Sequence, residues 1–380
     1  MDLTESRKLI DKIDSEILEL FIKRMEVASD IADYKKANGM EVMQKGRERV
    51  VLQNVCKQAG PDMENYARIL FTTLLDLSKS YQNSRNSQRD GALHSKIIEA
   101  LDSTPKIFPK SGVIACQGIE GAYSQIACDK LFKNPDIHYV KTFEDVFNAV
   151  DNGICDYGIL PIENSIHGTV NAVYDLMRNY QFHIVKSIKL KVNHALMAKA
   201  GVEISQIKEI ISHEQALGQC SEFLKKYPDI KITVCVNTAV AAKTVGESNR
   251  HDIAAISSPD CASYYGLSIL DERVANSDSN FTRFICISKK LEIYPGADRV
   301  SIIMNLPHIP GSLNSIIMKF ATAGLNLTKL ESRPIPGKDF EFSFYFDLEA
   351  SIYSEETISI LDELATGENN FVFLGSYVQV

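Results

Sequence analysis

The sequence lacks the features that would indicate a metal site, a disulfide framework or a membrane span. Its eight cysteines and eight histidines include no C-x-x-C pair and no metal-ligand spacing, so we expect buried, reduced thiols and no bound metal. No apolar run approaches the roughly 18 residues of a membrane-spanning helix. The formal net charge of -8 favours solubility and offers no basic surface for nucleic acid. We therefore expect a cytoplasmic protein with neither membrane nor nucleic acid as a partner.

The sequence does contain enough apolar chain for several domains. A chain of 380 residues exceeds the size at which one hydrophobic core usually stops growing. Apolar residues make up 45% and charged residues 24%, which is ordinary for globular domains. The pattern predicts a multidomain protein: an all-helical unit over residues 1–90, a linker over 91–110, an α/β unit over 111–290 and an α+β unit over 297–380.

Two of these units have a recognisable order of elements. In the α/β unit, short apolar runs alternate with amphipathic helices, which predicts two or more largely parallel sheets. The expected strands include Gly112–Cys116, Tyr157–Ile162, Glu209–Ser212, Ile232–Val236 and Ile253–Ser257. The C-terminal unit reads strand, helix, strand, strand, helix, strand, the order of a small ferredoxin-like domain. Its expected elements are Ser301–Leu306, Ser312–Ala323, Leu325–Pro334, Phe340–Leu348, Ser354–Thr366 and Phe371–Tyr377.

Two cations interrupt the apolar face of the first helix. On a helical wheel, isoleucine and leucine side chains between residues 10 and 31 form one stripe. Arg24 and Lys35 point in the same direction as the centre of that stripe. One such residue would be expected to snorkel or to pair with a carboxylate. Two on one face indicate an anion site, because burying an unpaired cation costs several kcal/mol, to order of magnitude. Arg7 lies at the flank of the stripe and could reach the same pocket from a second subunit.

These positions belong to a larger pattern in the helical unit. Arg47-Glu48 opens the next helix, where a lone pair of this kind is usually surface charge. Over residues 1–85 the sequence resembles the all-helical class of chorismate mutases. The pattern comprises Arg7, Asp14, Arg24, Lys35, Arg47-Glu48-Arg49, Ser78 and Gln82. One position departs from it: Gln44 stands where this family often has an acid.

The resemblance implies a swapped dimer that binds chorismate. Arg24, Arg47 and the partner subunit's Arg7 would hold the two carboxylates, and Ser78 would contact the substrate. Lys35 and Gln82 would contact the ether oxygen, while Glu48 would take the ring hydroxyl. The rearrangement to prephenate needs no nucleophile and no proton transfer, so clamping and stabilisation of developing charge can carry the catalysis.

The α/β unit contains a glycine pair that is ambiguous alone. Gly118-x-x-Gly121 follows an expected strand and precedes a helix, which suits either a carboxylate site or a simple turn. Four further segments occur with it in one order, and together they resemble prephenate dehydratase. The five segments are Gln117–Ser124, Pro161–Val170, Ser212–Cys220, Asn237–Ala242 and Asn280–Phe284. We expect each at the carboxyl end of a strand, beside a cleft between two lobes like those of periplasmic binding proteins.

The resemblance to prephenate dehydratase also implies roles for individual residues. Thr282 is the principal catalytic residue of the family, hydrogen-bonded to the departing hydroxyl or protonating it. The candidate substrate contacts are Glu163, Asn164, Ser165, Thr169, Thr238 and Arg283. For Arg283 two readings stay open: it holds a substrate carboxylate, or it pairs with Glu163. Loss of CO₂ and aromatisation drive the reaction, so no cofactor is expected.

The C-terminal unit resembles the ACT domain of phenylalanine-regulated dehydratases. Gly311, Ser312 and Leu313 open a helix, and Glu331-Ser332-Arg333 ends the next strand. Gly311 would let the backbone approach the carboxylate of a bound amino acid. The resemblance implies that these two motifs bind phenylalanine at a dimer interface and that binding inhibits the dehydratase.

Together, the resemblances imply a bifunctional enzyme of phenylalanine biosynthesis, both an isomerase and a lyase, that acts as a homodimer or homotetramer. The competing hypothesis is an amino-acid-binding regulatory protein that kept the lobes and the ACT unit but lost the chemistry. Thr282, Lys35 and Glu48 favour the enzyme, because a pure binder needs no polar groups matched to bond breaking. A preference for prephenate over arogenate is inferred from the fused mutase alone.

Overall fold

The structure is a computed structural model in which residues 2–38, 45–86, 91–338, 341–367 and 370–380 are described. It divides into two compact units. One consists of Met1–Ile98 with Met304–Phe371, and the other consists of Glu99–Ile303 with Val372–Val380. Among the described helices, none is long and apolar enough to cross a membrane.

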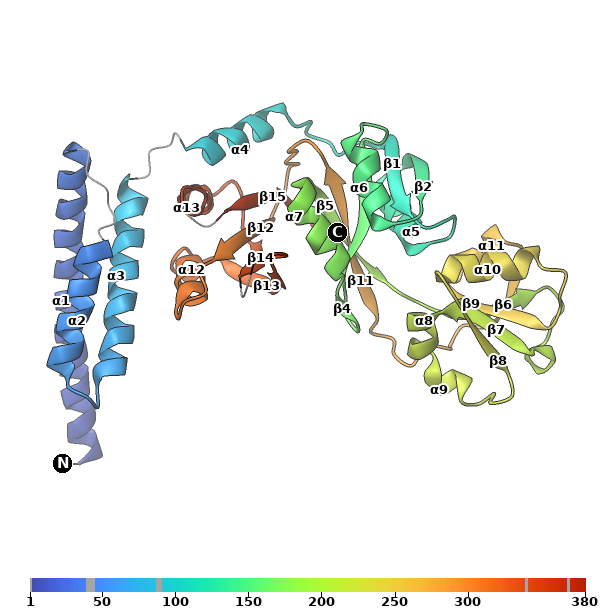
Figure 1. Ribbon diagram of the computed structural model, residues 1–380, viewed down its shortest axis with the longest axis horizontal. Coiled ribbons are helices and arrows are strands. Elements are labelled where there is room, and N and C mark those ends of the chain that lie inside the picture. The colour runs from blue at the N-terminus through green and yellow to red at the C-terminus, as the bar shows by residue number, and fades with distance from the viewer. Residues whose placement is uncertain (1, 39–44, 87–90, 339–340, 368–369) are drawn as a thin grey trace. The chain divides into compact units, whose positions relative to one another are not determined.

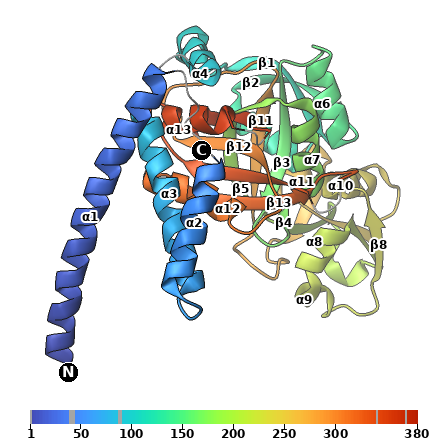
Figure 2. The same cartoon turned by 60° about the vertical axis from the view of Figure 1, so that its left-hand side comes forward.

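Three long helices form the N-terminal segment, as the sequence predicts. They are α1 (Leu3–Ala37), α2 (Lys45–Ala59) and α3 (Glu64–Asn86). The apolar stripe of α1 is largely exposed, with Ile10 at 56%, Ile17 at 58% and Leu20 at 66%. The N-terminal part of α1 extends past the ends of α2 and α3 (Figures 1 and 2), so these two helices leave much of the stripe uncovered.

The expected linker contains a packed helix. Helix α4 spans Ala92–Ser103, and Ile97 on it is fully buried. Further on, the hydroxyl of Thr104 accepts a hydrogen bond of 3.0 Å from the backbone N–H of Ile293. The segment before the α/β region therefore contains a helix with a buried side chain, followed by a hydrogen bond to the chain at Ile293.

The first lobe of the α/β region contains a six-stranded sheet of order β2-β1-β3-β11-β5, with β4 paired to β3. Its strands are β1 (Ser111–Gln117), β2 (Asn134–Val140), β3 (Tyr157–Asn164), β4 (Gly168–Thr169), β5 (His183–Lys191) and β11 (Phe281–Ser288). Its helices are α5 (Tyr123–Leu131), α6 (Phe143–Asp151) and α7 (Asn171–Tyr180). Strand β1 is parallel to β2 and β3, whereas β11 is antiparallel to both β3 and β5.

The second lobe contains a five-stranded sheet of order β10-β6-β9-β7-β8. Its strands are β6 (Ala195–Lys199), β7 (Glu209–His213), β8 (Lys231–Cys235), β9 (Ile253–Ser257) and β10 (Leu267–Asp271). A 3-10 turn (Ile204–Gln206) and four helices complete it: α8 (Glu214–Gln219), α9 (Ser221–Leu224), α10 (Thr238–Glu247) and α11 (Asp260–Tyr264). Strand β7 is parallel to β8 and β9, and β6 is antiparallel to β9 and β10.

The expectation of largely parallel sheets is therefore wrong, because both sheets are mixed. The reason lies in the path of the chain between the lobes. Strand β5 leads out of the first lobe towards β6, and β11 returns after β10 to pair with β5 in the opposite direction. A strand that returns beside its outgoing neighbour is necessarily antiparallel to it.

The C-terminal elements follow the predicted ferredoxin-like order. They are β12 (Arg299–Leu306), α12 (Ser312–Thr322), β13 (Asn326–Pro334), β14 (Phe342–Glu349), α13 (Glu355–Ala365) and β15 (Val372–Tyr377). The sheet order is β13-β14-β12-β15, with Phe320 of α12 packed edge-on against Phe346 of β14. After β15, the chain pairs with β5, where the Ser187 N–H donates to the Val378 carbonyl at 3.0 Å.

Candidate active sites

Polar contacts join α1 to α3 at the predicted mutase site. One amino group of Arg24 donates to the carbonyl oxygen of Leu74 at 3.0 Å and also to the hydroxyl of Ser78. One turn further along, the Gln82 side-chain amide donates to the carbonyl oxygen of Ala28 at 2.8 Å. Burial lowers the pKa of the Arg24 guanidinium, which nevertheless stays protonated at neutral pH. The structure thus brings three of the predicted residues, Arg24, Ser78 and Gln82, together.

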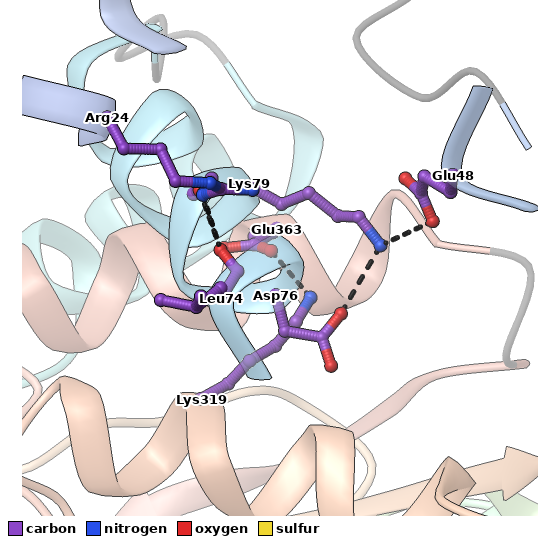
Figure 3. A network of polar contacts seen from close by, with 8 residues as sticks. Arg24, Glu48, Leu74, Asp76, Lys79, Lys319 and Glu363 are labelled. Atoms are coloured by element: carbon purple, nitrogen blue, oxygen red, sulfur yellow. Dashed lines mark hydrogen bonds and ion pairs between the residues drawn. The ribbon is translucent and has the colours of Figure 1, made fainter. Parts of the chain in front are cut away.

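Glu48 of α2 reaches the same part of α3 through a lysine. The Lys79 ammonium lies 3.0 Å from a carboxylate oxygen of Glu48 and 3.2 Å from one of Asp76 (Figure 3). Burial works to lower the pKa of Lys79, but the hydrogen bond and the charge of Glu48, together with Asp76, outweigh it, and the pKa is raised. Lys79 is therefore a firmly protonated bridge between two carboxylates.

The remaining predicted mutase residues stand at other positions of α1 and α2. Lys35 is half-buried near the end of α1, and Arg47 is exposed at the start of α2. Arg7 is exposed and precedes Arg24 by seventeen residues on one helix, a separation of about 25 Å at the usual rise. It cannot reach the Arg24 region of its own chain. Gln44 lies outside the described residues, and the substrate contacts assigned to all these residues remain predictions.

The dehydratase motifs surround a cleft of about 460 Å³ within the α/β region, a volume within the usual range for small-molecule sites. Both lobes contribute polar side chains to its lining. From the first lobe come Gln117, Tyr123, Ser124, Asn164, His167, Thr169 and Thr282, and from the second lobe, with its connection from β5, come His194, His213, Gln215, Gln219, Asn237 and Thr238.

Two helices begin at this cleft. Gly118 and Gly121 have φ values of 113° and 85°, a left-handed conformation that favours glycine and turns the chain sharply from β1 into α5. The N-cap residue of α5, Ala122, supplies no side-chain hydrogen bond, so a ligand carboxylate can satisfy the first N–H groups of this helix. Across the cleft, α10 begins at Thr238, and its N-cap Asn237 accepts from the Val240 N–H at 2.8 Å.

Thr282 is buried and its hydroxyl is oriented by Asn164. The side-chain oxygen of Asn164 accepts the backbone N–H groups of Ile166 and His167 at 3.0 and 2.9 Å. That orientation leaves its amide nitrogen to donate to the Thr282 hydroxyl oxygen at 2.9 Å and to Asn280 at 2.8 Å. Because the hydroxyl oxygen accepts from Asn164, the Thr282 proton can be donated towards the cleft.

The position of Thr282 corrects one expectation. Four of the five motifs lie at or beyond the carboxyl end of a strand, but Thr282 stands at the beginning of β11. Since β11 is antiparallel to β3, with Thr282 paired to Asn164, the start of one strand lies beside the end of the other. The catalytic candidate therefore reaches the same edge of the sheet from the opposite chain direction.

The hydrogen-bonded chain continues into residues that the sequence reasoning missed. The Asn280 amide donates to the Gln219 side-chain oxygen at 2.9 Å, and a ring nitrogen of His194 lies 2.7 Å from that same oxygen. Burial lowers the pKa of His194, so its ring is neutral at pH 7. Gln219 and Asn280 belong to two of the five dehydratase segments, Ser212–Cys220 and Asn280–Phe284, but the resemblance gives them no role. His194 gave no signal, being a single histidine before an apolar run.

Three predicted contacts do not line the cleft. The Nε atom of Arg283 lies 3.5 Å from a carboxylate oxygen of Glu163. This geometry favours an ion pair with Glu163 over a contact between Arg283 and a substrate carboxylate. Alternate residues of a strand face opposite sides, and Asn164 and Thr282 occupy the cleft side. The Ser165 hydroxyl donates to the Ser279 carbonyl and accepts from the Phe281 N–H, both at 2.9 Å, which fastens the loop after β3 to the start of β11.

The first of the two predicted sensor motifs, through Ser312 and Leu313, lines a smaller cavity of about 330 Å³. Its lining is largely apolar: Leu306, Pro307, His308, Ile309, Pro310, Ser312, Leu313, Phe342 and Phe344. Gly311, at φ 91°, is the N-cap of α12 and gives it no side-chain cap, which leaves N–H groups for a carboxylate. Glu331, Ser332 and Arg333 lie on β13 outside this lining, with Ser332 exposed. Their part in effector binding remains a prediction.

Comparison with known families identifies the two classes of domain. The chorismate mutase type II model matches residues 6–83, and the prephenate dehydratase model matches residues 114–292. The chain therefore carries a chorismate mutase domain and a prephenate dehydratase domain, the two enzyme classes that the geometry above suggests.

Whole-chain relatives identify the particular family. The bifunctional chorismate mutase/prephenate dehydratase of Escherichia coli (strain K12) is 30% identical over 381 residues, covering 98% of this chain and 95% of that protein. Arogenate dehydratase/prephenate dehydratase 2, chloroplastic, of Arabidopsis thaliana is 34% identical over 331 residues, covering 81% and 86%. A prephenate dehydratase from Arthrobacter aurescens, solved in complex with L-Phe, matches with a TM-score of 0.62 and 28% identity, over 70% of this chain and 90% of that one. This chain belongs to the bifunctional chorismate mutase/prephenate dehydratase family, which acts in aromatic amino acid biosynthesis.

Proposed function

We propose that this protein rearranges chorismate to prephenate, converts prephenate to phenylpyruvate, and is inhibited by L-phenylalanine. The observation that carries the proposal is the orientation of the Thr282 hydroxyl by Asn164 within a polar cleft. A protein that merely bound an amino acid would not need a buried hydroxyl whose proton is left for a ligand. We further propose a cytoplasmic location, in line with the expectation from the sequence.

In the mutase site, we assign the work to fixed charges and amides. Arg24, Arg47 and the partner subunit's Arg7 would grip the two carboxylates and hold the reacting carbons close together. Lys35 and Gln82 would stabilise the negative charge that develops on the ether oxygen as the C–O bond breaks. Ser78, which already contacts Arg24, would contact the substrate, and Glu48 would accept the ring hydroxyl.

In the dehydratase site, the C–C bond to the leaving carboxylate breaks and releases CO₂. Its electrons move into the ring and expel the hydroxyl, which takes a proton from Thr282 and leaves as water. Thr282 regains that proton from solvent. A hydroxyl is a weak acid, and the N–H of Asn164 on its oxygen, at 2.9 Å, stabilises the charge that develops there. Thr169, Thr238 and the N-terminus of α5 would hold the substrate carboxylates.

Two features support assembly with a second copy of the chain. The exposed apolar stripe of α1 would be costly to leave in water over this length, and Arg7 is too far from Arg24 along one helix to complete its site. We propose a homodimer in which each α1 contributes Arg7 to the other subunit, and a homotetramer would be a pair of such dimers.

The activity test is direct. Purified protein given chorismate should form prephenate and then phenylpyruvate, followed by absorbance. Formation of neither product would favour the amino-acid-binding regulatory protein. Because the Arabidopsis relative is named for both substrates, turnover of prephenate and of arogenate should be compared in the same assay, and we expect prephenate to be the better substrate.

A further inference from the structure

The bridging lysine of the mutase site is not part of the recognised substrate-binding set. Lys79 lies on α3, and its ammonium contacts Glu48 on α2 at 3.0 Å and Asp76 on α3 at 3.2 Å. The side chains of these three residues are only 20–28% exposed. The contact that holds Glu48 therefore comes from a residue one position after Ser78, which itself contacts Arg24.

The charges around this lysine are balanced. Arg24 from α1 and Lys79 supply two cations, while Glu48 from α2 and Asp76 supply two carboxylates (Figure 3). Helices α12 and α13 of the same compact unit also contact α3, and their nearby charges, Lys319 and Glu363, form a pair with each other. Without Lys79, two carboxylates would face a dianionic substrate with one fewer neutralising charge.

We propose that Lys79 is a positioning residue for the mutase step, which orients the Glu48 carboxylate to accept the ring hydroxyl of the substrate. The inference rests on the proposed role of Glu48. Lys79 engages one oxygen of that carboxylate, Oε2, and leaves the other to accept a hydrogen bond. Asp76, three residues earlier on the helix, anchors the ammonium, so that Lys79 does not compete with Arg24 for a substrate carboxylate.

The test uses full-length protein with Lys79→Met, Lys79→Arg, Glu48→Gln and the Lys79→Met/Glu48→Gln double variant. For Lys79→Met we expect kcat/KM for chorismate to fall about ten- to a hundredfold, the range of one lost charge-assisted hydrogen bond. Lys79→Arg should restore much of the activity, because it keeps a cation that can contact Glu48 and Asp76.

The double variant separates positioning from a merely structural role. If Lys79 acts through Glu48, adding Lys79→Met to Glu48→Gln should cost no further activity. Circular dichroism and thermal unfolding of the same samples report whether the helical unit of each variant is folded, and dehydration of added prephenate reports the state of the α/β region. Lys12→Met is the matched control, because Lys12 pairs with Glu16 on the exposed side of α1, and it should behave as wild type.

Two results would overturn the inference: an unchanged kcat/KM in Lys79→Met, or fully additive losses in the double variant. The wild-type arm distinguishes these from failure of the proposed function. If wild-type protein forms no prephenate from chorismate, the mutase assignment falls and the inference falls with it. If wild-type protein is active and Lys79→Met matches it, only the inference falls.

Discussion

Replacing Asn164 by aspartate tests the dehydratase mechanism with almost no change in shape. Aspartate can still accept the N–H groups of Ile166 and His167, now 3.0 and 2.9 Å from the asparagine oxygen. It cannot donate, so three hydrogen bonds are lost, to Asn280, to the Phe281 carbonyl and to Thr282. The Thr282 hydroxyl would then donate to the new carboxylate, and its proton would turn away from the substrate.

The magnitude follows from what Thr282 supplies. General acid catalysis contributes about 10²–10⁴ in rate, and the substitution removes this contribution while adding a negative charge beside a dianionic substrate. We expect kcat for dehydration of prephenate to fall by roughly a thousandfold, with a rise in KM from charge repulsion. The assay is absorbance of phenylpyruvate from added prephenate, with mutase activity on chorismate as the internal control.

The reasoning would be refuted by an Asn164→Asp variant that keeps dehydratase kcat within a fewfold of wild type. Thr282 would then not depend on the amide donor. A variant that lost both activities would instead indicate a folding defect, which thermal unfolding would detect.

Three further predictions rest on separate contacts. Arg24→Ala should lower mutase turnover by about a hundredfold or more while sparing dehydration of added prephenate; unchanged mutase turnover would remove the proposed clamp. Ser312→Lys should place a long, charged side chain in the 330 Å³ cavity and weaken phenylalanine inhibition at least about tenfold, as measured by dehydratase assays with and without the effector. The pKa of Glu209 is lowered to about 2, first by the Thr233 hydroxyl and then by Arg250 and Lys231. The ionised Glu209 stabilises the fold fully above the ordinary pKa of 4.5, and this stabilisation is lost as the pH falls towards 2. In Glu209→Gln, the free energy of unfolding should therefore change less with pH over this range, as measured by denaturant unfolding at a series of pH values.

The element types were predictable because they follow from periodicity and breakers. Strand β9 spans the expected Ile253–Ser257, and β8 differs from Ile232–Val236 by one residue at each end. The direction of strands was not predictable in the same way. Nothing in the run around Phe281 shows that β11 returns beside β5, because antiparallel pairing is set by the path between the lobes and not by local sequence.

The site was predictable where a motif contains it and not elsewhere. Arg24 could be singled out from its place on an apolar helix face, because the cost of burying a cation there can be judged from neighbouring residues of the same helix. Lys79 and His194 carry no such local sign. Each contacts a residue far along the chain, Glu48 on another helix and Gln219 in the second lobe, and contacts of that kind depend on tertiary packing.

The separation of the two sites makes these experiments interpretable. Arg24, Glu48 and Ser78 lie in one compact unit, and Asn164 and Thr282 lie in the other. None of the side chains around the helical site lines the cleft. A substitution that acts on chemistry should therefore remove one activity and leave the other, whereas global unfolding removes both. Each activity thus reports on global unfolding in a single sample, and thermal unfolding of each variant distinguishes a chemical loss from local unfolding of the unit that carries the substitution.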